Sequence, residues 1–411
     1  MEVLLLTPEP PYPLHGGGAF RTASLLHYFA QFARVDMVLL SDSGSAAPVP
    51  AGLVRSQQVI PLAPHGRGTA ARYMRNARRA LRRVPPLIDR LSALEKPIEK
   101  AIAGRHYDIG VVEHFWCAPY VNLLSKFCTE TVLDLHNVES VLHERCAGVS
   151  GGLILAGHRR FAAASQELES ALMPRFSAVL AASEDDARAV RTIAPGAKVQ
   201  VYPNSLPWVD PPQAGDAFER RPGRIVFSAN FEYHPNIDAV EFLTGEIWPK
   251  IRKLRPELRL RLVGRGDSFI RHLLPKGAVE ETGIEVTGPV ADAGAEIAQA
   301  QVAIAPLRAG SGTRIKILEA WAAARPVVAT PLAAEGLRAE DGVNIALETE
   351  PEGFASTVVN LTADYDRRLR LGREGRRTFE HLYTWKAAWK YLDTDLQLTR
   401  NSGLSGYTGI F

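Results

Sequence analysis

A glycine-rich turn followed by a helical pattern is the part of this sequence best suited to chemistry. It lies in the run APLRAGSGTRIKILEAWAAARPVVATPLAAEG, residues 305–336. Glycine lets the backbone approach an anion closely, and the first unpaired N–H groups of a following helix point toward that anion. We therefore predict that a diphosphate binds at this turn, which consists of Gly310, Ser311, Gly312, Thr313 and Arg314.

A lysine and a glutamate follow the turn at helical spacing. Counting four and then three residues from Gly312 reaches Lys316 and Glu319, so a helix would place all three on one face. There Lys316 would neutralise phosphate and Glu319 would accept hydrogen bonds from ribose hydroxyls, so we predict that both are catalytic residues. An ordinary ion pair on a capped amphipathic helix has the same spacing, and the spacing alone leaves both interpretations open.

Five further segments accompany the turn in a characteristic order. They are TPEPPYPLHGGGAFR from Thr7, LDLHNVES from Leu133, AASEDDARAV from Ala181, VYPNS from Val201 and GPVAD from Gly288. With these segments, most of the chain resembles the large retaining GT-B glycosyltransferase family usually numbered four, the glycosyl transferases group 1. The resemblance implies an α/β fold of two facing Rossmann-like, doubly wound domains with a cleft between them. It also implies transfer of a hexose-like sugar from a nucleoside-diphosphate sugar.

The composition is that of a globular protein with two ordinary domains. The chain has 411 residues, of which 46% are hydrophobic, and a net charge of +3. This length allows two sizeable cores, and the nearly balanced charge gives no reason to expect nucleic acid as a partner. Cys117, Cys128 and Cys146 are odd in number and lack metal-ligand spacing, which argues for reduced thiols and against a disulfide framework or a zinc site.

Short apolar runs alternate with longer helical patterns in both halves of the chain, as in βαβ units. A proline-rich stretch at 204–223 interrupts this alternation and marks the domain boundary. The predicted parts are an N-terminal Rossmann-like, acceptor-side domain at 1–205, a linker at 206–223, a nucleotide-sugar-binding domain at 224–385, a helix at 386–400 and a loose tail at 401–411. The resemblance implies that the helix at 386–400 crosses back to the first domain.

Glycines follow several of the predicted strands, where ligands bind in open α/β sheets. Some are expected near phosphate or acceptor and others near the nucleotide base. The first group is Gly16, Gly17 and Gly18, and the second is Gly264, Gly266 and Gly288. Beside the first group, His15 and Arg21 are expected on a solvated loop and helix face.

His136 ends the apolar run TVLDLH and should emerge at the carboxyl end of a strand. A lone histidine in such a place is more often structural. The resemblance, however, implies that a histidine here contacts the transferred sugar, so we predict that His136 is a catalytic residue. Glu113 and His114 end the preceding apolar run and are expected to contact the acceptor.

The acidic cluster at Glu184, Asp185 and Asp186 is not interpreted as a metal site. Ser183 followed three residues later by Asp186 is a helix-capping pattern, and acidic residues are favourable in a first helical turn. The resemblance implies chemistry without a metal and without a cofactor, since the nucleoside-diphosphate sugar is a substrate.

The sequence departs from the family pattern at two places. Ser311 stands where a first glutamate is usual, eight residues before Glu319, and Asn230 and Pro235 stand where an arginine and a lysine usually neutralise the diphosphate. The combinations HPN and GSGTRIK nevertheless resemble a subgroup associated with bacterial exopolysaccharide sugar transferases.

A basic run lies between Arg67 and Arg83. It contains seven arginines and no acidic residue, at positions 67, 72, 75, 78, 79, 82 and 83. A solvated basic face and a face that docks on an anionic membrane are equally consistent with it. The chain lacks the features of a signal peptide or membrane span. We therefore expect a cytoplasmic location, with peripheral contact at the inner face of the membrane as a further expectation.

The sequence as a whole predicts a retaining glycosyltransferase that acts on a growing glycan or a lipid-linked acceptor, in polysaccharide or glycolipid biosynthesis. Two alternatives remain at this point. One is a nucleotide-sugar epimerase or hydrolase of the same fold, which needs carboxylates aimed at the sugar. The other is a catalytically silent subunit that binds sugar nucleotides.

Overall fold

The structure is a computed structural model that describes residues 1–42, 47–64, 69–210, 223–312 and 314–395. These residues form two compact units. The first unit contains Met1–Val138, Ala164–Ser205 and the described residues from Thr384 onward. The second unit contains Glu139–Ala163 and Leu206–Tyr383. Residues 139–163 thus group with the second unit, although the sequence alternation assigned them to the N-terminal domain.

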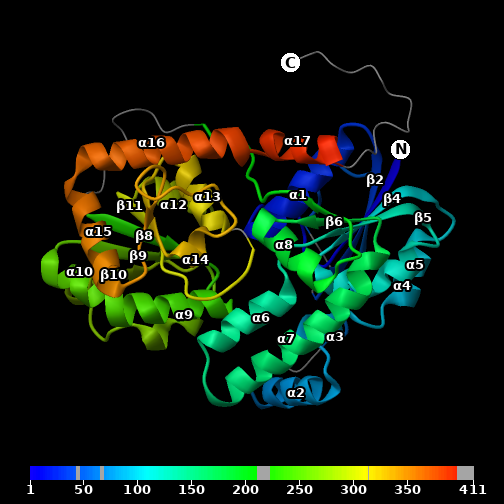
Figure 1. Cartoon of the computed structure of the whole chain (residues 1–411), viewed down its shortest axis with the longest axis horizontal. Helices are drawn as coiled ribbons and strands as arrows, with labels where there is room; N and C mark the ends of the chain where they lie inside the picture. The colour runs from blue at the N-terminus through cyan, green and yellow to red at the C-terminus, as the bar shows by residue number, and fades with distance from the viewer. Residues whose placement is uncertain (43–46, 65–68, 211–222, 313, 396–411) are drawn as a thin grey trace. The chain divides into compact units, whose positions relative to one another are not determined.

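A parallel sheet of seven strands forms the centre of the first unit, and Figure 1 labels four of them, β2, β4, β5 and β6. The strand order is β3-β2-β1-β4-β5-β6-β7. Its central strands are buried on both faces because helices cover them, as their continuous apolar sequences indicate. The strands are β1 (Glu2–Thr7), β2 (Arg34–Ser41), β3 (Ser56–Pro61), β4 (Tyr107–Glu113), β5 (Cys128–Asp134), β6 (Ala178–Ala181) and β7 (Val199–Val201). The helices are α1 (Gly17–Ala30), α2 (Thr69–Arg82), α3 (Pro86–Leu91), α4 (Glu95–Ile102), α5 (Val121–Leu124), α8 (Glu184–Ile193) and α17 (Trp385–Asp395).

The second unit is built on a parallel sheet of six strands, in the order β10-β9-β8-β11-β12-β13. The strands are β8 (Arg224–Ser228), β9 (Arg259–Val263), β10 (Ile284–Val286), β11 (Val302–Ala305), β12 (Val327–Ala329) and β13 (Ala346–Leu347). Its helices are α6 (Glu139–Gly148), α9 (His234–Phe242), α10 (Trp248–Leu254), α11 (Val279–Thr282), α12 (Ala293–Ala298), α13 (Ile315–Ala322), α14 (Pro331–Ala334), α15 (Pro351–Ala363) and α16 (Tyr365–Leu382). Helix α7 (Gly152–Leu172) contains the point at which the chain passes from the second unit to the first. The two doubly wound sheets confirm the predicted α/β class.

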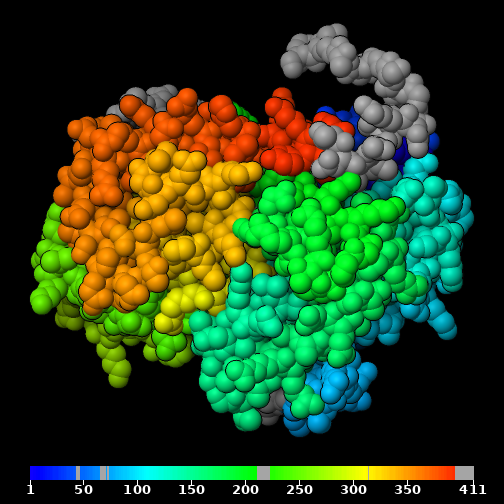
Figure 2. Space-filling view, in the orientation of Figure 1, coloured from blue at the N-terminus to red at the C-terminus, as the bar shows by residue number. Residues whose placement is uncertain are grey.

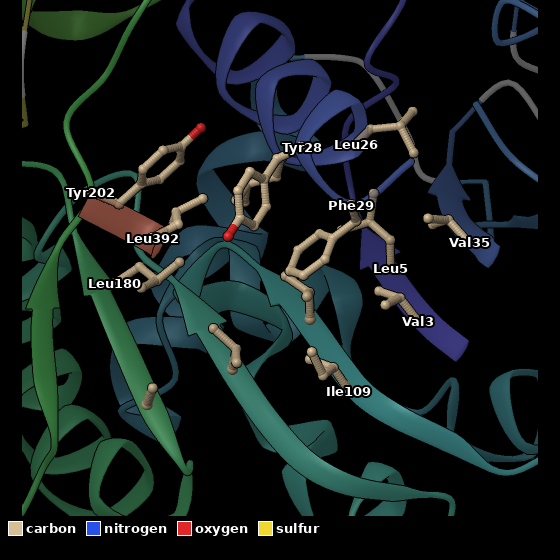
Figure 3. Packing of buried hydrophobic residues seen from close by; sticks show 14 of the residues in the cluster. Val3, Leu5, Leu26, Tyr28, Phe29, Val35, Ile109, Leu180, Tyr202 and Leu392 are labelled. Atoms are coloured by element: carbon tan, nitrogen blue, oxygen red, sulfur yellow. The ribbon is translucent and has the colours of Figure 1, made fainter. Parts of the chain in front are cut away.

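The core of the first unit joins the sheet to helices from both ends of the chain (Figure 3). Leu26 and Phe29 of α1 pack in one cluster with Leu392 of α17. The Nε1–H group of Trp389 lies 3.1 Å from the hydroxyl of Ser24, to which it donates a hydrogen bond. Helix α17, at the end of the described chain, is therefore part of the first unit.

The acidic cluster at the start of α8 is a helix cap. The backbone N–H of Asp186 donates to the hydroxyl of Ser183 at 3.1 Å, and Ser183 has the extended conformation of an N-cap residue. The three acidic residues occupy the first turn, where the helix dipole favours negative charge. The capping interpretation from the sequence is confirmed. Among the described helices, none has the length and apolar character needed to cross a bilayer.

Candidate functional site

The predicted diphosphate turn connects β11 to α13 in the second unit. Its two glycines adopt conformations that other residues rarely take, with φ of 114° at Gly310 and 76° at Gly312. Ser311, between them, is buried. Arg314, the N-cap residue of α13, makes no capping hydrogen bond with its side chain to the first backbone N–H groups of the helix. This is the arrangement that binds anions at helix N-termini.

Helix α13 begins later than the sequence count assumed. Its first residue is Ile315, because Gly312 is left-handed and Arg314 is extended, with φ −86° and ψ 98°. The expectation that Gly312 shares a helical face with Lys316 and Glu319 is therefore wrong. Lys316 and Glu319 both lie within α13 and keep their spacing of about one turn. Thr313 lies outside the described residues.

The side chain of Arg314 folds back and contacts the glycine turn. The guanidinium group is buried and donates to the carbonyl oxygen of Gly312 at 2.7 Å, and also to that of Ser311. A Cβ atom at Gly310 would lie 2.9 Å from Nη2 of Arg314, so the guanidinium also fills the space beside that glycine. Arg314 thus fixes the shape of the turn.

A second arginine reaches the turn from α6. Nη1 of Arg145 donates to the carbonyl oxygen of Gly310 at 3.0 Å. The same guanidinium forms a paired contact with the carboxylate of Glu335, in which Nη2 lies 2.8 Å from Oε1. Arg145 lies 165 positions before Gly310, and no local motif marks it, so sequence reasoning missed it. Arg145 places a guanidinium beside the turn, although its charge is paired with that of Glu335.

Lys316 is held by Asn236, which in turn contacts Asn230, one of the two residues that replace the usual cations. Its Nζ donates to Oδ1 of Asn236 at 2.7 Å, and Nδ2 of Asn236 donates to the carbonyl oxygen of Asn230 at 2.8 Å. The ammonium also lies 4.6 Å from the ring centroid of Phe227. Burial lowers the pKa of Lys316 to about 7, with a smaller contribution from the nearby charge of Arg314. Lys316 is therefore poised to gain a full charge when an anion binds beside it.

Glu319 shares this environment. Burial raises the pKa of its carboxyl to about 7, and the neighbouring charge of Lys316 opposes that rise. Two groups of opposite type that both titrate near neutrality, one turn apart, are more typical of a binding or catalytic site than of a solvated ion pair. This observation favours the functional interpretation of the spacing.

Close backbone approach also marks the strand ends of the second unit. Gly264 follows β9, and a Cβ atom there would lie 1.9 Å from the carbonyl oxygen of Ala229, which follows β8. The N–H of Gly264 donates to the carbonyl oxygen of Gly288, which follows β10, at 3.2 Å. Gly266, nearby, is left-handed with φ 82°. These glycines allow neighbouring loops to meet at the carboxyl edge of the sheet, where nucleotides bind in such folds.

In the first unit, the glycine run precedes and opens α1. Gly16 has φ 91°, and the helix begins at Gly17. A Cβ atom at Gly18 would lie 1.9 Å from Oε2 of Glu9, so a larger residue here would displace that carboxylate. His15 is exposed on the loop, as expected.

Arg21 is not on a solvated face, and that expectation was wrong. Its guanidinium is 1% exposed and forms a two-point contact with the carboxylate of Asp134, with Nε 2.7 Å from Oδ2. Nη1 donates to the carbonyl oxygen of Tyr202 at 2.7 Å and to Oδ1 of Asn204 at 2.9 Å. The residue spacing near Gly16–Gly18 could not show this burial, because the three partners of Arg21 come from distant strands and their loops.

Asp134 connects this arginine to the predicted catalytic histidine. Nε2 of His136 lies 3.4 Å from Oδ2 of Asp134 and 2.6 Å from Oε2 of Glu113. Burial disfavours the imidazolium, but the hydrogen bonds to the two carboxylates outweigh that cost and raise the pKa of His136 to about 9. His136 is therefore a charged hydrogen-bond donor at neutral pH.

Glu113 and His114 surround His136 rather than facing solvent. Glu113 is fully buried, and burial together with the charge of Asp134 raises the pKa of its carboxyl above the usual value. The ring of His114 stacks on that of His136 with centroids 3.5 Å apart, and burial lowers the pKa of His114 to about 4. Glu113 thus acts on His136 as a positioning residue, a role that the sequence did not indicate.

Comparisons with known proteins agree with these two doubly wound units. Residues 222–364 match the model of a family described as glycosyl transferases group 1. No curated protein sequence matches the chain. Solved structures similar to nearly the whole chain include the three described next, and they show its fold.

Sucrose-phosphate synthase from Thermosynechococcus elongatus has a TM-score of 0.75 and 15% identity, covering 98% of this chain and 100% of the other. HepE from Anabaena, in complex with UDP and glucose, has a TM-score of 0.63 and 15% identity over 96% and 99% of the two chains. A glycosyltransferase from Rickettsia africae has a TM-score of 0.60 and 14% identity over 97% and 99%. The predicted GT-B fold class is thereby confirmed.

Proposed function

We propose that this protein is a retaining glycosyltransferase that moves a sugar from a nucleoside-diphosphate sugar to a glycan or lipid-linked acceptor. The observation that carries the proposal is the glycine turn before α13, followed by Lys316 and Glu319, whose pKa values both lie near 7. The family match over residues 222–364 supports it. HepE was solved with UDP and glucose, so UDP-sugars are the first donors to test. The pathway we propose is polysaccharide or glycolipid biosynthesis of the exopolysaccharide type.

The residues of each unit have distinct tasks in this proposal. The turn and Lys316 stabilise the diphosphate that departs, which gains negative charge in the transition state. Arg145 and Arg314 hold the carbonyl groups of the turn, so that its backbone N–H groups keep their direction. Glu319 accepts hydrogen bonds from ribose hydroxyls. His136, charged at neutral pH, donates to the transferred sugar.

Incubation with a panel of sugar nucleotides separates the proposed activity from its alternatives. We expect the protein to release nucleoside diphosphate slowly without an acceptor and faster with one, and NMR of the product to show a retained anomeric configuration. A new sugar isomer in solution would instead identify an epimerase. Binding without turnover, over the whole panel and with glycan and lipid-linked acceptors, would identify a silent subunit.

We also propose that α2 of the first unit docks on an anionic membrane surface. Arg78 and Arg82 are exposed, and so are two apolar side chains of the same helix, Met74 at 70% and Leu81 at 76% (Figure 2 shows α2 at the surface). Arg79 is less available, because its Nε lies 2.8 Å from the carboxylate of Asp89. Apolar and basic groups on one exposed helix are typical of membrane-surface helices. Arg67 and the side chain of Arg72 lie outside the described part.

Replacing Arg75, Arg78 and Arg82 with glutamine should release the protein from anionic vesicles. Each basic residue near such a surface contributes about 1 kcal/mol, so we expect the partition coefficient to fall by roughly two orders of magnitude. Sedimentation with vesicles of phosphatidylserine and phosphatidylcholine measures it, and added salt should have the same effect on the wild type. A matched control replaces the exposed Arg370, Arg373 and Arg377 of α16. Equal sedimentation of both variants would contradict docking through α2.

A further inference from the structure

A cluster of one thiol and three imidazoles lies in the second unit and contains none of the side chains assigned a task above. His143 and Cys146 are three positions apart on α6, His158 is on α7, and His234 is the first residue of α9. One ligand atom each of Cys146, His158 and His234 lies within 4.8 Å of the other two. Nδ1 of His143 lies 3.0 Å from Nδ1 of His158. Three helices therefore bring metal-binding atoms to one point.

One nitrogen atom of this cluster lacks a hydrogen-bond partner among the described residues, and a bound metal ion would take that partner's place. Nδ1 of His234 is buried and has no hydrogen-bond partner among the described residues. A buried polar atom without a partner calls for an explanation, and an ion or water is the usual one. Cys146 is a free, buried thiol. A buried cysteine alone is more often a packing residue, but here two imidazoles from other helices lie within reach of its sulfur.

The ligand types and distances fit zinc. Thiolate sulfur and imidazole nitrogen are its common protein ligands, at about 2.3 Å and about 2.0–2.1 Å. In a tetrahedral site, these lengths place the ligand atoms about 3.3–3.6 Å apart. In the structure the three ligand atoms lie up to 4.8 Å apart, so they have to move about 1 Å closer to bind zinc. Rotation of the side chains supplies this movement. Histidine ligands commonly hydrogen-bond to a second group through the other ring nitrogen, and His143 offers such a contact to His158.

We propose that Cys146, His158 and His234 bind a zinc ion, with a water molecule as its fourth ligand and His143 as the hydrogen-bonded neighbour of His158. The ion would join α6 and α7 to the N-terminus of α9. Arg145, which binds the carbonyl oxygen of Gly310, is adjacent to Cys146 on α6. The site therefore holds in place the helix whose Arg145 contacts the glycine turn. His234 lies two positions before Asn236, the partner of Lys316, but no zinc ligand has a task in the chemistry proposed for Lys316 and Glu319.

Cobalt and zinc titrations of the full chain, prepared without a tag and stripped of metal, test this site. We expect one equivalent of Co²⁺ to bind with the strong near-ultraviolet absorption of a cobalt–thiolate bond, and Zn²⁺ to displace it. Cys146→Ser should abolish that absorption, and His234→Ala should weaken zinc binding at least tenfold. Cys128→Ser, which removes a buried thiol of the first unit, is the matched control and should leave both unchanged.

Thermal melting provides a second readout. Zinc should raise the Tm of the wild type and of Cys128→Ser, but not that of Cys146→Ser or His234→Ala. Another set of possible ligands among the described residues, Glu113, Asp134 and His136, contains no sulfur and cannot produce the thiolate absorption. Absence of stoichiometric binding at micromolar Zn²⁺, or binding that survives both Cys146→Ser and His234→Ala, would overturn the proposal.

Discussion

Lys316→Ala is expected to weaken the binding of a nucleoside-diphosphate sugar by at least tenfold, or about 1.4 kcal/mol. The lysine is the cation of α13 next to the glycine turn, and its hydrogen bond to Asn236 at 2.7 Å fixes the position of Nζ. Glu319→Ala should reduce turnover by a similar factor, because it removes the acceptor for ribose hydroxyls. Isothermal titration calorimetry and steady-state kinetics measure the two effects.

The matched control is Lys250→Ala. Lys250 is a partly exposed lysine of α10 that pairs with the exposed Glu352 at 2.6 Å. Its removal should leave binding and turnover unchanged, since exposed ion pairs contribute little. If Lys316→Ala and Glu319→Ala both retained wild-type kinetics with unchanged melting temperatures, α13 would not be part of the donor site.

The pKa of Lys316 adds a pH dependence to this prediction. Below pH 7 the free protein carries the ammonium, and above pH 7 it has to take up a proton to bind the anion. Affinity for a nucleoside-diphosphate sugar should therefore be highest below about pH 7 and should fall as the pH rises through that value. Lys316→Arg keeps its charge at high pH and should lose most of this dependence. An identical pH profile in wild type and Lys316→Arg would assign the dependence to another group.

The fold was predictable because its signals are local. Alternating apolar strands and helical patterns extend over both halves, and the proline-rich stretch at 204–223 separates them. The grouping of residues 139–163 with the second unit was not predictable. Tertiary contacts decide it, such as that of Arg145 with Glu335, which lies 190 positions away. Sequence patterns contain no information about such partners.

The candidate site likewise contains residues that were predictable from the sequence and residues that were not. The glycine turn, Lys316 and Glu319 lie within ten residues of one another and were recognised as a motif. The burial of Arg21 depends on Asp134, 113 positions later, and the cluster at Cys146 depends on His234 from another helix. Cysteine spacing therefore argued against a zinc site, whereas the folded chain brings imidazoles from α7 and α9 to the thiol. Sites whose residues come from distant segments of the chain can be recognised only in the folded structure.

His136→Ala is expected to lower turnover by roughly ten- to a hundredfold while UDP still binds to the second unit. A hydrogen bond from a charged donor contributes about 1.5–3 kcal/mol, which sets this range if the imidazolium stabilises the sugar in the transition state. The variant leaves Glu113 buried without its partner at 2.6 Å, so it also tends to destabilise the first unit. His136→Gln, which keeps a donor of similar size without the charge, is therefore measured beside it, together with thermal melting of both.

Glu113→Gln tests the charge of His136 while leaving the imidazole in place. The carboxylate of Glu113 helps to raise the pKa of His136 to about 9, so the wild type keeps the imidazolium below that pH and loses it as the pH rises through about 9. Without the carboxylate the pKa falls, and the alkaline limb of the kcat profile should move to lower pH, with KM for the donor little changed. A purely structural role for Glu113 would lower stability without moving that limb. An interaction confined to the transferred sugar cannot weaken the binding of UDP, which lacks that sugar. If the His136 variants lost UDP binding and turnover equally, His136 would therefore act in nucleotide binding or in the stability of the first unit.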